Sequence, residues 1–176
     1  MTVFIDADSC PSMVRDFVVE QCNSKNIPVV FAANHEIPKK ENQTFQMIIC
    51  SQEKDSADDY IVKNARSAEP DTPECADDLY GYSNTQKALS PEEAVKSGSD
   101  IVITRDLLLA KRLVDKNTAC INDRGTEFTA KNIARLLKER EEDLLYVSMG
   151  LVKHSKGSGY NKKEFAAFVN SFSKLI

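Results

Sequence analysis

Short apolar runs alternate along this chain with longer stretches in which apolar residues recur at helical spacing. The apolar runs predict buried strands, one beginning at Val3 and others at residues 27–32, 45–50, 101–104 and 119–121. The helical spacing predicts helices at residues 11–22, 55–65, 90–98, 107–114, 129–142 and 161–172. Repeated strand–helix units predict an α/β fold, a three-layer α/β/α domain with a mostly parallel central sheet.

Two of the helix starts carry capping residues, and two stretches of the chain have loop composition. Ser90–Pro91–Glu92–Glu93 has the form of a capping box with proline at the first helical position, and Asn161 with Glu164 forms a second box. Residues 69–85 combine acidic residues with proline and glycine, which indicates a surface excursion or a lid over a site. The Gly/Ser/Lys-rich residues 150–159 indicate a solvated loop or an anion-binding loop before the last helix.

Composition favours one soluble domain spanning residues 1–176. No apolar run reaches membrane-spanning length, and Asp6 and Asp8 lie in the first segment, unlike a signal peptide. The five cysteines are scattered and form no C-x-x-C pair, which argues against a disulfide framework and against a zinc site. We therefore expect a cytoplasmic protein without membrane association.

The candidate chemistry begins with Asp6 and Asp8, which end the first apolar run. If the strand stays extended through Asp8, both side chains share one face of the sheet, at the carboxyl end where α/β folds bind ligands. Two carboxylates there repel each other unless a cation lies between them. The alternative is that Asp8 or Ser9 caps the helix that follows while Asp6 is solvated.

Other carboxylates follow other strands or begin a helix. Asp106 follows the strand at residues 101–104, Asp123 follows the strand at 119–121, and Asp55 and Asp58 lie three residues apart at a helix start. The carboxyl ends of parallel strands meet at one edge, so these acids can converge. Simpler roles are a helix cap for Asp55 and a turn for Asp123.

Oxygen ligands without clustered histidine or cysteine favour Mg²⁺ or Mn²⁺ over zinc. Such ions support displacement at phosphorus by activating water. Arg105 and Arg124 lie in the same loops as these acids and are candidates for binding phosphate oxygens. The net charge of −4 argues against a general nucleic-acid binder and leaves room for a local basic patch with a metal ion.

Four motifs occur in a specific order. They are Asp6–Ala7–Asp8–Ser9–Cys10–Pro11, Asp55–Ser56–Ala57–Asp58, Asp100–Ile101–Val102–Ile103–Thr104–Arg105–Asp106 and Asn122–Asp123–Arg124–Gly125. Together, from Val3 to about Leu137, they resemble the bacterial YaiI/YqxD family, whose members are similar to PIN-like, metal-dependent nuclease domains. The resemblance implies a PIN-like fold with catalytic and metal-binding carboxylates at Asp6, Asp8, Asp58 and Asp106.

The chain departs from the family pattern in two places. Residues 67–97 resemble an insertion, because the family passes quickly from the helix after Asp58 to the strand at Ile101. The family's Thr-Gly-Gly-Pro loop and the Asp-Arg pair after it are replaced by residues 155–159 and 163–164. The implied function is a metal-dependent nuclease acting on RNA or single-stranded nucleic acid.

Two other functions fit parts of the same pattern. In a haloacid-dehalogenase-like phosphatase, Asp6 would be the nucleophile, Asp8 the acid/base and Thr104 the phosphate-binding hydroxyl, although Cys10 stands where that family has threonine or valine. The other alternative is a non-catalytic adaptor that binds RNA or protein. A catalytic Cys10 thiol at a helix N-terminus is a further option beside a purely structural thiol.

Overall fold

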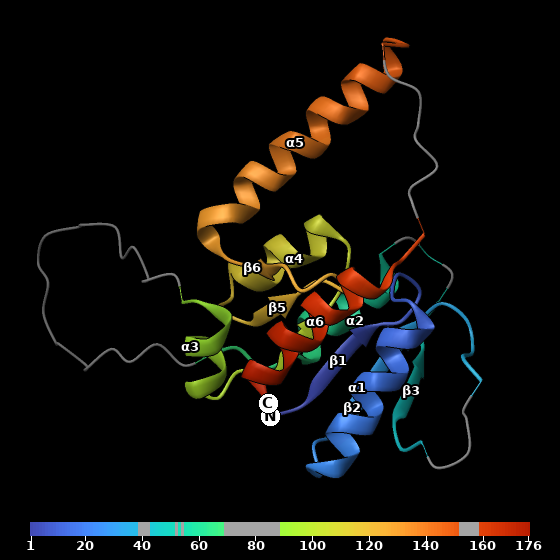
Figure 1. Ribbon diagram of the computed structural model, residues 1–176, viewed down its shortest axis with the longest axis vertical. Helices are drawn as coiled ribbons and strands as arrows, with labels where there is room; N and C mark the ends of the chain where they lie inside the picture. The colour runs from blue at the N-terminus through green and yellow to red at the C-terminus, as the bar shows by residue number, and fades with distance from the viewer. Residues whose placement is uncertain (39–42, 52, 54, 69–88, 152–158) are drawn as a thin grey trace, which may run out of the picture.

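The computed structural model describes residues 1–38, 43–51, 53, 55–68, 89–151 and 159–176 (Figure 1). Its strands are β1 (Val3–Asp6), β2 (Val29–Ala33), β3 (Gln46–Ile49), β4 (Ile101–Ile103), β5 (Ala119–Ile121) and β6 (Glu127–Phe128). Its helices are α1 (Ser12–Ser24), α2 (Ser56–Asn64), α3 (Pro91–Lys96), α4 (Leu107–Val114), α5 (Ala130–Ser148) and α6 (Lys162–Leu175). The excursion predicted at residues 69–85 lies outside the described residues.

The strands form one sheet in the order β3-β2-β1-β4-β5-β6. The first five strands in this order pair in parallel, and β6 pairs with β5 in antiparallel fashion. The chain runs outward from β1 through β2 to β3, then returns to the other side of β1 to form β4. The sheet therefore has its topological switch point between β1 and β4, where α/β proteins bind ligands beyond the carboxyl ends of the strands.

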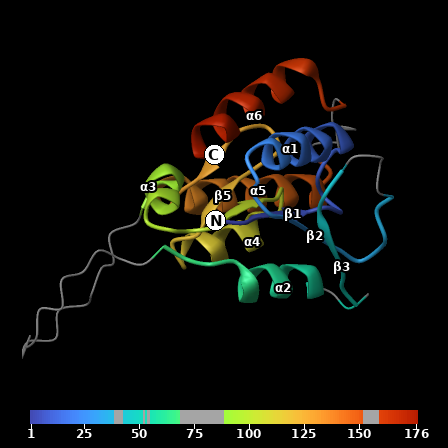
Figure 2. The ribbon, with the colours of Figure 1, turned by 90° about the horizontal axis from the view of Figure 1, so that it is seen from below.

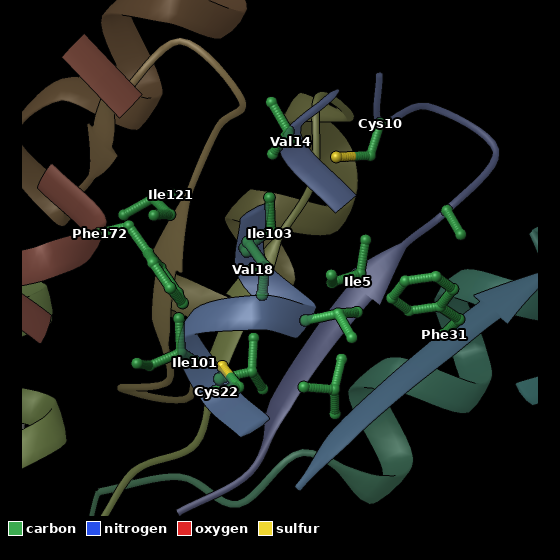
Figure 3. Packing of buried hydrophobic residues seen from close by; sticks show 14 of the residues in the cluster. Ile5, Cys10, Val14, Val18, Cys22, Phe31, Ile101, Ile103, Ile121 and Phe172 are labelled. Atoms are coloured by element: carbon green, nitrogen blue, oxygen red, sulfur yellow. The ribbon is translucent and has the colours of Figure 1, made fainter. Parts of the chain in front are cut away.

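Helices cover both faces of the sheet, as predicted (Figure 2). Strand side chains alternate between the faces, so Val3 and Ile5 join one apolar core and Phe4 joins the other. The first core contains α1 and α6, with Val18 beside Ile103 and Phe172 beside Ile121 (Figure 3). The second core is built with α2, α4 and the start of α5. This arrangement confirms the single-domain α/β/α fold.

Element boundaries differ from the prediction mainly after residue 121. The two-residue strand β6 was not expected, because it is too short to show an alternating pattern. Helix α5 continues to Ser148 rather than ending near residue 142. Its outer part projects from the sheet (Figure 1) and carries the exposed apolar side chains Leu144, Leu145 and Tyr146, and exposed Met149 and Leu151 follow the helix.

Both predicted capping boxes are present. At α3 the Ser90 hydroxyl accepts from the Glu93 amide while the Glu93 carboxylate accepts from the Ser90 amide, and Asn161 and Glu164 do the same at α6. Ala94 of α3 is buried against the first core, so the end of the segment predicted as an insertion packs into the domain. Among the described residues no helix combines the length and apolar character needed to cross a membrane.

Candidate functional site

A pocket of about 350 Å³ opens at the switch point, beyond the carboxyl ends of β1 and β4. Strand β1 contributes Asp6, β2 is followed by Asn34, and β4 is followed by Asp106. The N-terminus of α2 closes another side. The lining residues are Asp6, Asp8, Ser9, Asn34, Asp55, Ala57, Asp58 and Asp106. The structure thus gathers into one pocket the four acids predicted as a site, together with Asp55.

Asp6 is the most buried of these acids, with 7% of its surface exposed. Burial raises the pKa of Asp6, while hydrogen bonds from Ser9 and Thr104 oppose that shift. Both hydroxyls donate to the same atom, Oδ2, over 2.7 Å. No hydrogen bond within the described part of the chain reaches the other oxygen, Oδ1. The carboxylate is therefore fixed through one oxygen while the second is left without a protein donor.

Thr104 connects Asp6 to Asp106. Its hydroxyl accepts from the Asp106 backbone amide over 2.9 Å and donates to Asp6. The Asp106 side chain also caps α4, because its Oδ1 accepts from the Leu108 amide over 2.7 Å. Asp106 thus begins a helix and lines the pocket at the same time, so a capping role does not remove it from the site.

Asp8 reaches the pocket by a different route from the one predicted. Strand β1 ends at Asp6, so the argument that Asp6 and Asp8 share a strand face was wrong. A turn follows β1. In this turn Asp8 Oδ2 accepts a hydrogen bond from the backbone amide of Asn34 over 2.8 Å, and Asp8 Oδ1 lies 2.8 Å from His35 Nδ1. Asp8 and Ser9 also do not cap α1, whose N-cap is Pro11 without a side-chain hydrogen bond.

Asp55 and Asp58 approach the other acids from the start of α2. The pKa of Asp58 is raised to about 6. Burial is the largest cause, and repulsion from Asp6, Asp106 and Asp55 adds to it. Asp55 is the N-cap residue of α2, but its side chain makes no capping hydrogen bond. Its backbone has a left-handed φ of 63°, which costs energy for a residue other than glycine. The pocket therefore concentrates negative charge that its own side chains do not neutralise.

The described residues contain no group of three His, Cys, Asp or Glu side chains placed to enclose a metal ion as they stand. Much of the carboxylate surface is already used, since Asp6, Asp8 and Asp106 each accept hydrogen bonds from protein donors. The donor set still suits a hard cation, because it consists of carboxylate and amide oxygens. Mg²⁺ commonly keeps several waters and uses only one or two carboxylates, so an open acidic pocket fits it better than a closed cage would.

The two predicted phosphate-binding arginines lie outside the lining of the pocket. Arg105 forms an ion pair and hydrogen bond with Asp123, and Arg124 lies 3.4 Å from a Glu164 carboxylate oxygen. Asp123, only 1% exposed, does not reach the other acids, so it is not part of the acidic pocket. Its other oxygen, Oδ1, is buried and has no hydrogen-bond partner among the described residues. The sequence did not indicate this pairing, although Arg105 and Asp123 follow the neighbouring strands β4 and β5.

Cys10 does not have the environment of a nucleophile. It is 6% exposed, and burial raises the pKa of its thiol, with the Asp123 carboxylate adding to the effect. The N-terminus of α1 would lower the pKa of the Cys10 thiol, but burial has the larger effect. The structural interpretation of Cys10 is therefore the one that the geometry favours.

Two residues of the site were missed by sequence reasoning. Asn34 and His35 follow β2, and both contact Asp8. Their position directly after a buried strand was the available signal, since β2 pairs with β1 and ends at the same edge. That neighbourhood becomes visible only once the strand order is known.

A family model described as "Uncharacterized BCR, YaiI/YqxD family" matches residues 4–69 and 93–176. The residues that the model leaves out, 70–92, fall within the insertion predicted at residues 67–97. All four acids of the proposed site lie in matched segments.

Relatives match along almost the whole chain. A UPF0178 protein of Treponema denticola is 32% identical over 176 residues, covering 100% of this chain and 92% of the relative. One of Pseudomonas putida is 28% identical, covering 100% of this chain and 96% of the relative. One of Treponema pallidum is 28% identical, covering 99% and 80% respectively. No solved structure matches. The chain belongs to the YaiI/YqxD family.

Proposed function

We propose that this protein is a PIN-like, divalent-metal-dependent nuclease that cleaves RNA or other single-stranded nucleic acid. The observation that carries the proposal is the charge of the pocket at the switch point. Asp6, Asp58 and Asp106 approach it from three separate elements, and burial together with their repulsion raises the pKa of Asp58 to about 6. A cation would relieve that repulsion.

Asp6, Asp58 and Asp106 would hold Mg²⁺ or Mn²⁺, with Asp8 beside them. A divalent cation there supplies water activation and neutralises charge that develops on a backbone phosphate. The protein prepares the carboxylates for this role. Ser9 and Thr104 fix Asp6 through Oδ2 and leave Oδ1 without a protein donor, and the amides of α4 fix Asp106 through Oδ1. Side chains held by their neighbours keep a site in place without a loss of conformational freedom on binding.

Water is the attacking group in this proposal. The buried Cys10 thiol has a raised pKa, and His35 Nδ1 is occupied by Asp8. No hydrogen bond in the described ranges joins the Cys10 thiol to a base that would activate it as a nucleophile. A cytosolic location is proposed as well, because Cys10, Cys22, Cys50 and Cys120 are all free thiols.

The test is a cleavage assay on fluorescently labelled RNA and single-stranded DNA with Mg²⁺ or Mn²⁺. Asp106→Asn should abolish most turnover while substrate binding changes much less. Asp59→Asn is the matched control, because Asp59 lies on α2 beside Asp58, pairs with Arg112 and does not line the pocket. It should cleave like the wild type.

One outcome would remove Asp106 from the reaction, and two would favour other functions. Equal cleavage by Asp106→Asn and wild type would remove Asp106 from the reaction. If the wild type cleaves nothing but forms a fluoroberyllate adduct at Asp6, the phosphatase alternative becomes the better account. If it binds RNA or protein without any reaction, the adaptor alternative does.

A further inference from the structure

The arginines near the site differ in how their charges are matched. Arg105 pairs with the buried Asp123, and Arg124 pairs with Glu164. On the other face of the sheet, Arg112 pairs with Asp59. Each of these guanidinium groups already has a carboxylate partner, which a phosphate would have to displace or share.

Arg15 is different. It lies in the first turn of α1, is half-buried, and its NH1 donates to the backbone carbonyl of Ala7 over 2.9 Å. No carboxylate in the described ranges lies within ion-pair distance of it. Ala7 stands between Asp6 and Asp8, so the hydrogen bond holds the Arg15 guanidinium at the turn that carries two acids of the pocket, although neither Ala7 nor Arg15 lines the pocket itself. A guanidinium has five N–H donors, and within the part of the chain that the structure describes only one of them is used.

The position of Arg15 is unfavourable for the helix itself. A positive side chain in the first turn of a helix opposes the helix dipole and generally costs a few tenths of a kcal/mol. The Arg15 guanidinium and the N-terminus of α1 both contribute positive potential at this point, which favours the binding of an anionic ligand.

We propose that Arg15 binds a backbone phosphate of a single-stranded nucleic acid whose neighbouring phosphate enters the acidic pocket. This inference rests on the proposed nuclease function and names a substrate contact for it. It replaces Arg105 and Arg124 as the principal phosphate-binding residues. The bond to Ala7 holds the guanidinium in position, and the remaining donors form the forked contact that phosphate oxygens accept.

The test measures binding of a fluorescein-labelled twelve-nucleotide oligouridylate by anisotropy. All proteins carry Asp106→Asn, so that the probe stays largely uncut while substrate binding changes little, and Mg²⁺ is present throughout. The variants are Arg15→Gln, Arg15→Lys and the control Arg135→Gln, which removes an exposed guanidinium paired with Glu139 on α5. Melting temperatures of each are measured in parallel.

Arg15→Gln should bind roughly tenfold more weakly at low salt, the effect of one charge-assisted hydrogen bond. The slope of log affinity against log salt should fall in magnitude by about 0.7, the value for one phosphate contact on a single strand. Arg15→Lys should retain most of the slope, and Arg135→Gln should match the parent.

An unchanged salt slope in Arg15→Gln would overturn this inference. If the melting temperature of that variant also fell, Arg15 would have the structural role of holding the turn at Ala7. A parent that binds no probe would overturn both this inference and the nucleic-acid function on which it rests. Binding by the parent with an unchanged Arg15→Gln slope leaves the proposed function standing.

Discussion

At the scale of single residues, several residues of the pocket have an unfavourable environment or backbone conformation. Asp6 is buried with a raised pKa, Asp58 is crowded by like charges, and Asp55 adopts a left-handed backbone. Such features persist where the surrounding structure over-determines them, and they cluster at functional sites. The energetic cost of Asp58 can be measured directly.

Asp58→Asn should stabilise the metal-free protein at pH 7.5, by about 1 kcal/mol once solvent screening of a half-buried group is allowed for. The folded pKa of about 6 lies above the ordinary value of 3.8. Stability from this group is therefore fully present below about pH 3.8 and is lost as the pH rises through about 6.

Thermal unfolding of wild type and Asp58→Asn in a chelating buffer, from pH 4 to pH 8, checks this prediction. The two curves should converge at the acid end and separate near neutrality. Asp59→Asn should show no such separation. Greater stability of the wild type above pH 6 would mean that Asp58 is not crowded by its neighbours.

Arg105→Gln should destabilise the fold by about 2 kcal/mol, because it leaves a buried carboxylate unpaired. Asp123 is 1% exposed, and its Oδ1 already lacks a partner. Arg112→Gln, which breaks an exposed pair with Asp59, should cost less than about 0.5 kcal/mol. Urea unfolding gives both values.

Adding Asp123→Asn to Arg105→Gln should recover part of the loss, because the amide carries no charge to desolvate. Equal, small losses in Arg105→Gln and Arg112→Gln would show that the Arg105–Asp123 pair has no structural role. Arg105 would then regain its standing as a phosphate-binding candidate.

At the scale of elements, the predictable part of the site followed from strand ends. Asp6 and Asp106 could be placed near each other because β1 and β4 are parallel and end at the same edge. Asp58 could be placed there through the start of α2. These inferences needed only the alternation of strands and helices, which the pattern of apolar residues predicts.

The unpredicted part depends on loop conformation and strand order. The turn after Asp6 places Asp8 against Asn34 and His35, and no periodic pattern encodes that turn. The pair of Arg105 and Asp123 requires knowing that β4 and β5 are neighbours. The length of α5 was not predicted, because the apolar residues of its outer part are exposed and belong to neither core.

The contact between α6 and the loop after β5 gives a prediction at this scale. Gly125 has a φ of 81°, and a Cβ atom there would lie 2.5 Å from the Ala167 carbonyl oxygen. Gly125→Ala should destabilise the protein by about 3 kcal/mol, combining left-handed strain with overpacking against the helix backbone.

Gly98→Ala is the matched control, since Gly98 has a φ of 89° but open space around its Cα. It should cost only about 1 kcal/mol, the strain alone. Differential scanning calorimetry of the two variants separates the contributions. Similar losses would indicate that α6 shifts easily away from the loop.

At the scale of the whole molecule, the fold brings a single patch of acids to one edge of a sheet covered on both faces. The family model matches on both sides of residues 70–92, and the segments that it matches carry β1, α2 and β4, the elements that contribute Asp6, Asp58 and Asp106. The central claim is therefore that this framework presents a cation site.

Thermal unfolding during titration with Mn²⁺, in wild type, Asp6→Asn and Asp59→Asn, tests that claim most directly. The wild type and Asp59→Asn should be stabilised progressively, by about 2.7 kcal/mol at a concentration one hundred times the dissociation constant. Asp6→Asn should stay folded and show no stabilisation, because an amide keeps the bonds from Ser9 and Thr104 without the charge. A wild-type melting temperature that ignores millimolar Mn²⁺ and Mg²⁺, or an Asp6→Asn response equal to the wild type, would contradict the account.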